Sequence, residues 1–128
     1  MFTKTMSYTL RIALLSLALC ASARAEQVEV ATGILCDTQK QMERFVALYD
    51  GDASTAISAV NGEENDPTAC VVATIAYLRG PEIITARTKN GTFQIMQVLV
   101  VAIFSHGAFR ASIPTPYFSV KRVAERAA

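Results

Sequence analysis

Apolar and polar residues alternate early in the chain. Val28, Val30 and Thr32 occupy every second position between residues 26 and 35, which predicts a first strand with one buried face. Gly33 follows in the same run, and a glycine inside a strand is typical of a bend or a bulge. We therefore expect a short and locally distorted first strand.

The pattern then changes to helical spacing. Thr38 and Gln41 have the spacing of a capping box, in which each residue's side chain bonds the other's backbone N–H at the start of a helix. Four apolar residues follow at positions i, i+3, i+4 and i+7 of one face: Met42, Phe45, Val46 and Tyr49. This stripe predicts an amphipathic helix, which we expect to end at Gly51.

A second, shorter helix is predicted from Asp52 to Val60. Asp52 has the side chain of a helix N-cap, and alanine and branched apolar residues follow it on one face. The pair Asn61-Gly62 is predicted to end the helix. Residues 63–68 read Glu-Glu-Asn-Asp-Pro-Thr, which predicts an acidic loop.

Residue preferences turn to β-structure after this loop. Residues 70–78 are rich in β-branched and apolar side chains, as in a strand buried on both faces. Residues 79–81 read Arg-Gly-Pro and predict a turn. Residues 95–104 are the most apolar stretch beyond residue 25, and ten residues are too few to cross a bilayer. They predict a long core strand that bends near its middle.

Asn90-Gly91 predicts a hairpin between these regions. This pair is favoured in a two-residue type I′ turn. Pairing outward from it places Thr88 opposite Phe93 and Ala86 opposite Ile95, so that one face is mostly apolar and the other mostly polar.

The remaining residues extend the predicted sheet. Residues 105–107 predict a turn, 108–113 a short strand, 114–116 (Pro-Thr-Pro) a stiff corner and 117–123 a last strand. Together the elements predict an α+β fold, with a curled antiparallel sheet of four to six strands and a short helical pair after the first strand. The alternative is a small SH3-like barrel.

Composition places the chain among globular proteins. The apolar content of 52% with 18% charged residues excludes intrinsic disorder, and 128 residues bound the chain to a single small domain. Residues 1–25 have the pattern of a secretory signal, with basic residues, an apolar run that ends at Cys20, and Ala23-Arg24-Ala25 as a small-x-small cleavage site. Cleavage between Ala25 and Glu26 leaves residues 26–128 as the domain, with no transmembrane segment. An uncleaved interfacial helix and a lipid on Cys20 are the alternatives.

The predicted cleavage changes the charge of the protein. Three of the 12 Lys and Arg residues lie in the signal, whereas all 11 Asp and Glu residues follow it. The domain therefore carries a net charge of about −2. The domain therefore lacks the excess of basic residues that is typical of nucleic-acid-binding proteins, which argues against a nucleic-acid partner.

Two cysteines, Cys36 and Cys70, remain after the signal is removed. An even number of cysteines in an exported chain predicts a disulfide, here between residues 34 positions apart. Free thiols, a redox pair, or a metal site that also uses His106 are the alternatives. The spacing is not that of a Cys-x-x-Cys redox motif.

The sequence marks no catalytic, cofactor-binding or metal-binding residue. His106 is the single histidine, and the adjacent Ser105 cannot face it as nucleophile and base. The acids Glu63, Glu64 and Asp66 are typical of a solvated loop. Asn90 begins a glycosylation sequon, which the turn explains without a glycan. Five aromatic residues belong either to the core or to a ligand pocket: Tyr49, Tyr77, Phe93, Phe104 and Tyr117.

Three segments, residues 33–38, 45–49 and 66–70, carry a resemblance. They read GILCDT, FVALY and DPTAC, and the chain resembles small exported proteins of unknown function from alpha-proteobacteria. The resemblance implies an exported location and carries no activity, cofactor or site residue with it.

These features predict an exported protein, periplasmic or secreted, that acts as a non-enzymatic binding or accessory module stabilised by one disulfide. Such a module would meet a protein or small-molecule partner, or a second copy of itself, through the polar hairpin face or an exposed sheet edge. No cofactor is expected. The alternative is a small-ligand carrier or a minimal enzyme with a pocket between helices and sheet.

Overall fold

The computed structural model describes residues 27–123. It contains a four-stranded antiparallel sheet and two helices that follow the first strand, which confirms an α+β arrangement. The predicted signal and its cleavage between Ala25 and Glu26 lie outside the described residues. In chain order the elements are β1 (Glu29–Cys36), α2 (Gln39–Leu48), α3 (Ala53–Glu64), β2 (Cys70–Thr88), β3 (Gly91–Ser105) and β4 (Ala108–Val123).

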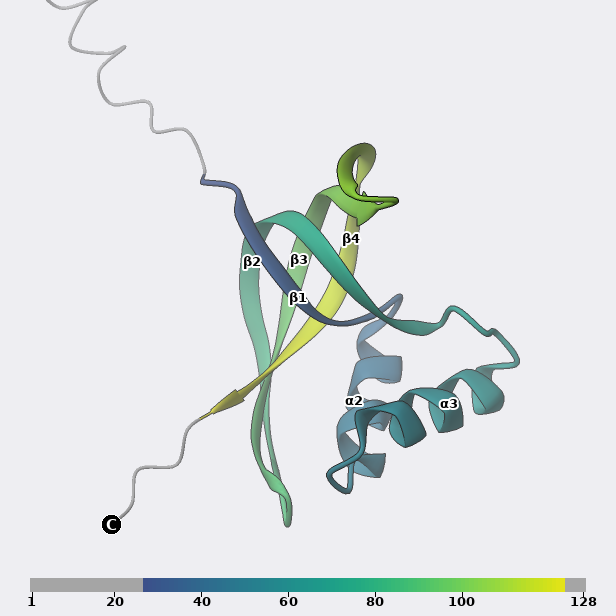
Figure 1. The fold of residues 1–128 in the computed structure, drawn as a ribbon. Coiled ribbons are helices and arrows are strands. Elements are labelled where there is room, and N and C mark those ends of the chain that lie inside the picture. The colour runs from purple at the N-terminus through teal and green to yellow at the C-terminus, as the bar shows by residue number, and fades with distance from the viewer. Residues whose placement is uncertain (1–26, 124–128) are drawn as a thin grey trace, which may run out of the picture.

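The sheet curls until its two edge strands meet. Its strands pair in the order β1-β2-β3-β4, all antiparallel. Within the described residues, β1 pairs with β4 only at Leu35–Ser119 and Cys36–Phe118. The closing ladder is so short that the sheet is not a clear barrel. Figure 1 shows the curled sheet with both helices on one side of it.

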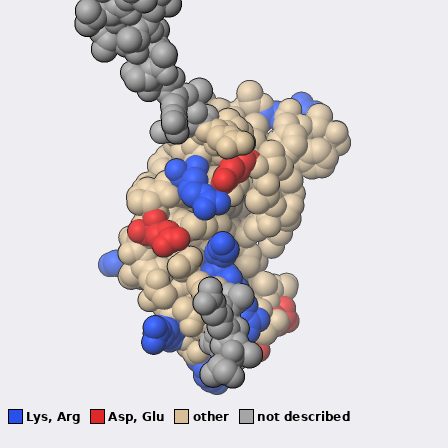
Figure 2. All heavy atoms as spheres, turned by 90° about the vertical axis from the view of Figure 1, so that its left-hand side faces the viewer, with Lys and Arg blue, Asp and Glu red and all other residues tan. Residues whose placement is uncertain are grey.

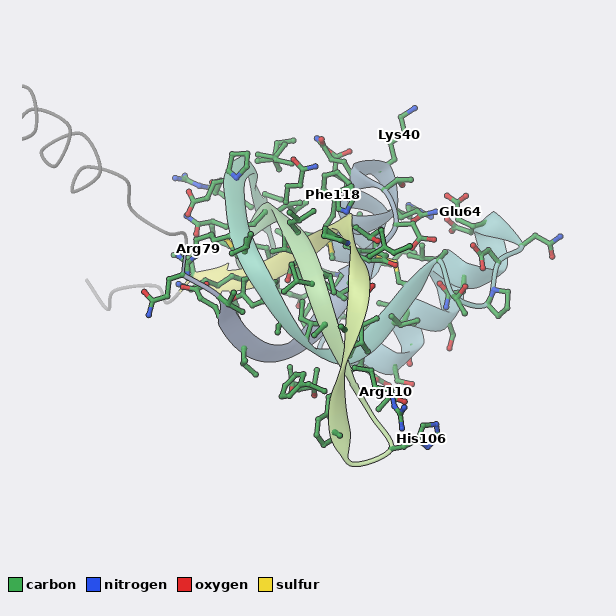
Figure 3. All side chains as sticks on the ribbon, turned by 90° about the horizontal axis from the view of Figure 1, so that it is seen from above. Lys40, Glu64, Arg79, His106, Arg110 and Phe118 are labelled. Carbon is green, nitrogen blue, oxygen red and sulfur yellow. A yellow bond between two sulfur atoms is a disulfide. The ribbon has the colours of Figure 1, made fainter. Side chains whose placement is uncertain are left out.

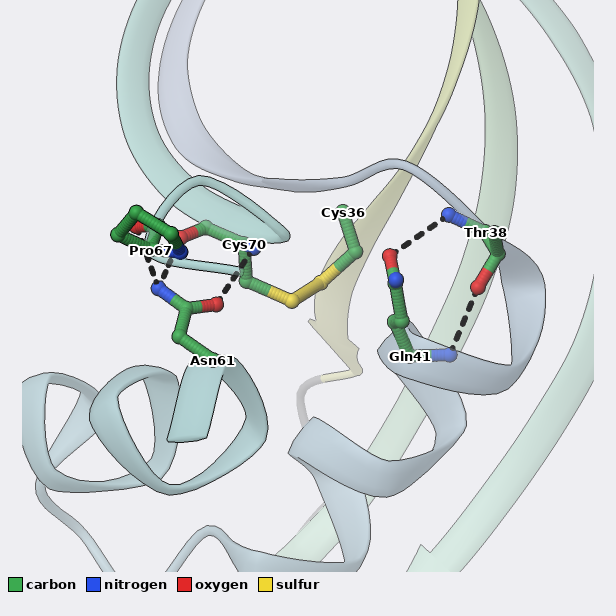
Figure 4. Close-up of a disulfide and its surroundings, with 6 residues drawn as sticks. All are labelled: Cys36, Thr38, Gln41, Asn61, Pro67 and Cys70. Atoms are coloured by element: carbon green, nitrogen blue, oxygen red, sulfur yellow. Dashed lines mark hydrogen bonds between the residues drawn. A yellow bond between two sulfur atoms is a disulfide. The ribbon is translucent and has the colours of Figure 1, made fainter. Parts of the chain in front are cut away.

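The disulfide between Cys36 and Cys70 is present. Cys36 is the last residue of β1 and pairs directly with Cys70, the first residue of β2. The bond therefore joins the two points where the chain leaves the sheet for α2 and α3 and returns to it (Figure 4). The predicted disulfide is confirmed, and the pair cannot serve as free thiols.

Helix α2 begins as its sequence predicts. The Gln41 backbone N–H donates to Thr38 Oγ1 over 3.2 Å, and the Thr38 N–H donates to Gln41 Oε1 over 3.0 Å, which completes the capping box. Met42, Phe45 and Val46 are buried as expected. The helix ends at Leu48, before the predicted stop at Gly51.

Helix α3 starts at the predicted N-cap and continues past the predicted end. The Asp52 carboxylate accepts from the Ser54 N–H over 3.0 Å. The pair Asn61-Gly62 lies inside the helix, which ends at Glu64 with Asn65 in the left-handed conformation (φ 52°). The predicted helix end is wrong for two reasons. The Asn61 side chain bonds Pro67 and Cys70, which lie outside the helix. A single glycine such as Gly62 lowers helix stability too little to end the helix. The first acids of the predicted loop therefore belong to the helix.

Strand β2 runs through the predicted turn at residues 79–81. Register shifts fall between Arg79 and Glu82 and between Glu82 and Ile84, so the chain forms an irregular bend within one strand. A Cβ on Gly80 would overlap the Gln97 carbonyl of β3. The glycine thus permits a close approach of two strands that the local sequence, read as a turn, did not reveal.

The β2–β3 hairpin exists, but its predicted register is wrong by two residues. Thr88 pairs with Gly91 and Ala86 with Phe93, which makes Lys89 and Asn90 the loop residues. The Asn90 side-chain amide donates to the Tyr49 carbonyl over 2.7 Å, a long-range contact that anchors this turn. A shift of two residues keeps every side chain on its predicted face.

The other predicted distortions also differ in the structure. Gly33 pairs regularly with Ala73, so β1 has no bulge against β2. Residues 114–116 lie within β4, and Pro116 pairs with Leu99. Within the described residues this part of β4 pairs only with β3, and prolines in sheets are found on such edge strands.

The core has two parts. Buried side chains of α2, α3 and the sheet form the first, which includes Met42, Phe45 and Ile95. Four residues inside the curl of the sheet form the second: Leu35, Ile75, Val98 and Val100. The apolar run at 95–104 is buried only in its first part, because β3 continues beyond the curl and exposes its end.

Candidate functional site

The edges of β1 and β4 separate beyond their two-residue contact. β1 pairs with β2 along its whole length, from Glu29 to Cys36. Its other edge is paired with β4 only at Leu35 and Cys36 within the described residues. Figure 1 shows the two strands crossing and then diverging. The backbone groups of two strand edges therefore border one opening, which we call the β1–β4 cleft.

The β1–β4 cleft has a volume of about 280 Å³ and an apolar floor. Leu35, Ile75 and Val98, which belong to the inner core of the curled sheet, line its base. The cleft thus reaches the interior of the sheet. Its remaining lining residues come from all four strands: Ala31, Thr32, Gly33, Tyr77, Arg79, Met96, Ser119, Val120 and Lys121.

Gly33 leaves space on the β1 side of the cleft. A Cβ built on Gly33 would meet no other atom within 4 Å. The alternation of β1 places Ala31, Gly33 and Leu35 on the inward face. Small residues near the mouth and a large one at the base therefore shape the opening.

A polar group forms one rim of the cleft. The Glu29 carboxylate accepts from Arg79 Nε over 3.2 Å, and both side chains remain exposed. The hydrogen bond to Glu29 and the negative charge of Glu29 raise the pKa of Arg79 above its usual value. Burial, followed by a hydrogen bond with Glu29, raises the pKa of Tyr77. The rim therefore holds a neutral phenol beside an ion pair.

The opposite rim is formed by the end of β4. Lys121 lies there as an exposed cation. Ser119, closer to the base of the cleft, is paired with Leu35 of β1. Figure 2 looks onto this side of the molecule and shows acidic and basic side chains scattered among uncharged ones. The cleft is thus apolar at its base and mixed in charge at its mouth.

A second, smaller opening leads to the same inner core. It has a volume of about 240 Å³ and includes Leu35, Ile103 and Tyr117. Asp37 lies at its edge, where burial and the nearby Asp66 carboxylate raise the pKa of Asp37. The inner core is therefore approached from both sides of the short β1–β4 contact.

Within the described part of the chain, the residues of the alternative metal and catalytic sites lie at the surface or have other partners. His106 lies exposed in the β3–β4 loop (Figure 3), and Cys36 and Cys70 are bonded to each other. Among residues 27–123, no three His, Cys, Asp or Glu side chains gather to hold a metal ion. Glu63 forms an ion pair of 2.9 Å with Arg44, and Asp66 accepts from the Thr68 N–H over 2.9 Å.

The aromatic residues divide between core and clefts. Tyr49 and Phe93 pack edge-to-face in the core beside the helices, with ring centroids 5.6 Å apart. Tyr77 lines the β1–β4 cleft and Tyr117 lines the second opening. Phe104 is exposed. The sequence identified these aromatics as candidates, whereas the roles of Gly33 and Lys121 depend on strand pairing that only the structure shows.

Comparisons with protein-family models, with curated proteins and with solved structures find no match to this chain. None of the helices in the described part is long and apolar enough to cross a membrane. The resemblance to small exported proteins stays a prediction.

Proposed function

We propose that this chain is an exported binding module that takes up an extended segment of another protein in the β1–β4 cleft. One observation carries the proposal: two strand edges diverge from a short contact above an apolar floor. An extended chain can add to such an edge through backbone hydrogen bonds, while its side chains give specificity.

The strand edges beside the cleft favour a peptide as its ligand, because they offer backbone groups as well as an apolar floor. The volume of the cleft is about 280 Å³, near the lower end of the range of roughly 300–1,000 Å³ that is usual for small-ligand sites. The space fits one or two apolar side chains, and the strand edges supply the remaining contacts. A segment with apolar residues at alternate positions would place them toward Ile75 and Val98.

Export is part of the proposal. The signal-like pattern of residues 1–25 supports it, and a disulfide is compatible with an oxidising compartment. The partner would then be a periplasmic or secreted protein, or a second copy of this chain. No catalytic step is included.

A peptide selection with a matched pair of variants tests the proposal. Dodecamer peptides would be selected from a random phage library on the purified wild-type protein. Gly33→Tyr should reduce binding of the selected peptides at least tenfold, because the ring would fill space that the structure shows beside Gly33. Val30→Tyr is the control, since it adds a ring to the same strand at an exposed position on the other face.

The two variants separate the cleft from the rest of β1. Loss of binding in Gly33→Tyr with retention in Val30→Tyr supports the cleft. Equal binding by Gly33→Tyr and the wild-type protein, with both folded by circular dichroism, would show that the peptides bind elsewhere and would overturn the proposal.

A further inference from the structure

The hairpin of β3 and β4 ends in an exposed apolar tip, residues 103–113. Four large apolar residues in it are exposed: Ile103 (37%), Phe104 (46%), Phe109 (45%) and Ile113 (86%). Figure 3 shows the hairpin projecting from the sheet, with His106 and Arg110 at its end. The tip lies away from the α2 and α3 helices and presents these side chains to solvent.

The tip is a tight and ordered structure. Phe104 pairs directly with Phe109 across the two strands, and their rings meet edge-to-face with centroids 5.3 Å apart. His106 and Gly107 form its two-residue loop with φ angles of 52° and 82°, as in a type I′ turn. The rings are therefore held in place before any partner binds.

The tip has one charged side chain, which is basic. No Asp or Glu occurs between Glu82 and Glu125 in the sequence. Arg110 is the cation of the tip, and its Nε lies 3.4 Å from the Ser105 carbonyl. Such a surface complements a partner that is apolar inside and anionic at its surface.

The exposed area of the tip is small for a protein partner. With about 200 Å² for each large apolar residue, the four exposed fractions leave about 400 Å². A stable protein interface buries roughly 800 Å² on each partner. A lipid surface has no such requirement, because apolar side chains gain by entering it one by one.

We propose that the β3–β4 tip inserts its apolar side chains into the surface of an anionic lipid bilayer. Phe104 and Phe109 would enter the boundary between headgroups and acyl chains, where the apolar side chains of interfacial segments are buried. Arg110 would meet lipid phosphate. The tip and the β1–β4 cleft are different parts of the molecule, so lipid insertion does not depend on peptide binding.

A tryptophan reporter tests the insertion at a defined position. The chain has no Trp, so Phe109→Trp would contain a single one at the tip. With vesicles of equal parts phosphatidylglycerol and phosphatidylcholine, its emission should shift to shorter wavelength and be quenched by brominated lipid. Val72→Trp, at a position on β2 that is 61% exposed, should show neither change. Because each reporter senses its own position, lipid contact by another part of the chain does not mimic the result.

Two further variants measure the contributions of apolar and charged groups. Ile113→Ser should weaken vesicle binding at least tenfold, because its exposed side chain loses the gain of entering lipid. Arg110→Gln should weaken binding to the anionic vesicles about fivefold and leave binding to phosphatidylcholine alone unchanged. Neither side chain is part of the core.

Three outcomes would overturn the proposal. The first is an unshifted emission of the Phe109→Trp variant in the presence of anionic vesicles. The second is equal quenching of both reporters, which would assign lipid contact to another surface. The third is concentration-dependent self-association that Ile113→Ser abolishes while vesicles leave the protein unbound, which would show that the tip meets a second copy.

Discussion

Cys36 and Cys70 are directly opposite residues of β1 and β2, and both are fully buried in the core beside the helices. Their disulfide, between residues 34 positions apart, closes the excursion that contains α2 and α3. The bond is also next to the β1–β4 contact, because Cys36 pairs with Phe118 of β4. One residue thus joins the helical pair, the sheet and the closed end of the cleft.

Removal of the disulfide should lower the free energy of unfolding by about 4 kcal/mol, according to the chain-entropy estimate for a loop of this length. Guanidinium unfolding of the oxidised protein and of Cys36→Ala/Cys70→Ala would measure the difference. The protein reduced by dithiothreitol is the control for the volume lost in the double variant. An unchanged midpoint in both samples would contradict a stabilising role for the bond.

Asn61 should be more important for stability than its place on a helix surface suggests. Its side chain accepts from the Cys70 N–H over 2.8 Å and donates to the carbonyls of Cys70 and Pro67, both over 3.0 Å. Asn61→Ala should cost about 1–3 kcal/mol, because it leaves a part-buried backbone donor without its partner.

Thermal unfolding would measure the effect of this change. Ser58→Ala is the control, as it removes an exposed polar group from the same helix. A similar melting temperature for the two variants would mean that water replaces the Asn61 amide and that α3 is not held to β2 in this way.

Two glycines should respond to alanine in opposite directions. Gly80→Ala should destabilise the protein by about 1–3 kcal/mol, since its Cβ would overlap the Gln97 carbonyl. Gly62→Ala should stabilise it by up to about 1 kcal/mol, because Gly62 lies in α3 with open space beside it. Urea unfolding of both variants tests the pair. Stabilisation by Gly80→Ala would show that β2 and β3 do not approach as described.

Asp52 should make stability depend on acid pH. Hydrogen bonds from Thr55 and Ser54 lower the pKa of Asp52 in the folded state. A group whose pKa is lower in the folded protein stabilises it above the unfolded pKa, near pH 4, and loses this contribution as pH falls through the lowered folded value.

The melting temperature of Asp52→Asn should therefore fall less steeply below pH 4 than that of the wild-type protein. Glu64→Gln, which changes an exposed acid at the other end of the same helix, is the control. Parallel pH profiles for Asp52→Asn and wild type would remove Asp52 as a source of the acid dependence.

Features set by neighbouring residues could be predicted from the sequence. The caps at Thr38 and Asp52 and the buried stripe of α2 depend on contacts within one or two helical turns. The disulfide was predictable because only one pairing exists after residue 25. In these cases the local pattern and the fold favour the same structure.

Features set by distant contacts could not be predicted in this way. Gly80-Pro81 has the local pattern of a turn, yet Gln97 of the adjacent strand makes it a bend within β2. The turn of the β2–β3 hairpin is also in contact with a distant residue, since Asn90 donates to the carbonyl of Tyr49, 41 residues away. The β1–β4 cleft depends on where the ladder between the first and last strands stops, which no local pattern specifies.

Hydrogen exchange at the two facing strand edges is the most direct test of the β1–β4 cleft as a binding site. The amides of residues 31–34 and 120–123 should exchange more slowly when a selected peptide is bound, because an added strand pairs with the groups at the cleft edges. The amides of α3 should not change. Protection of these segments at saturating peptide would support uptake of an extended chain between β1 and β4. Unchanged exchange at both edges under the same saturation would contradict it.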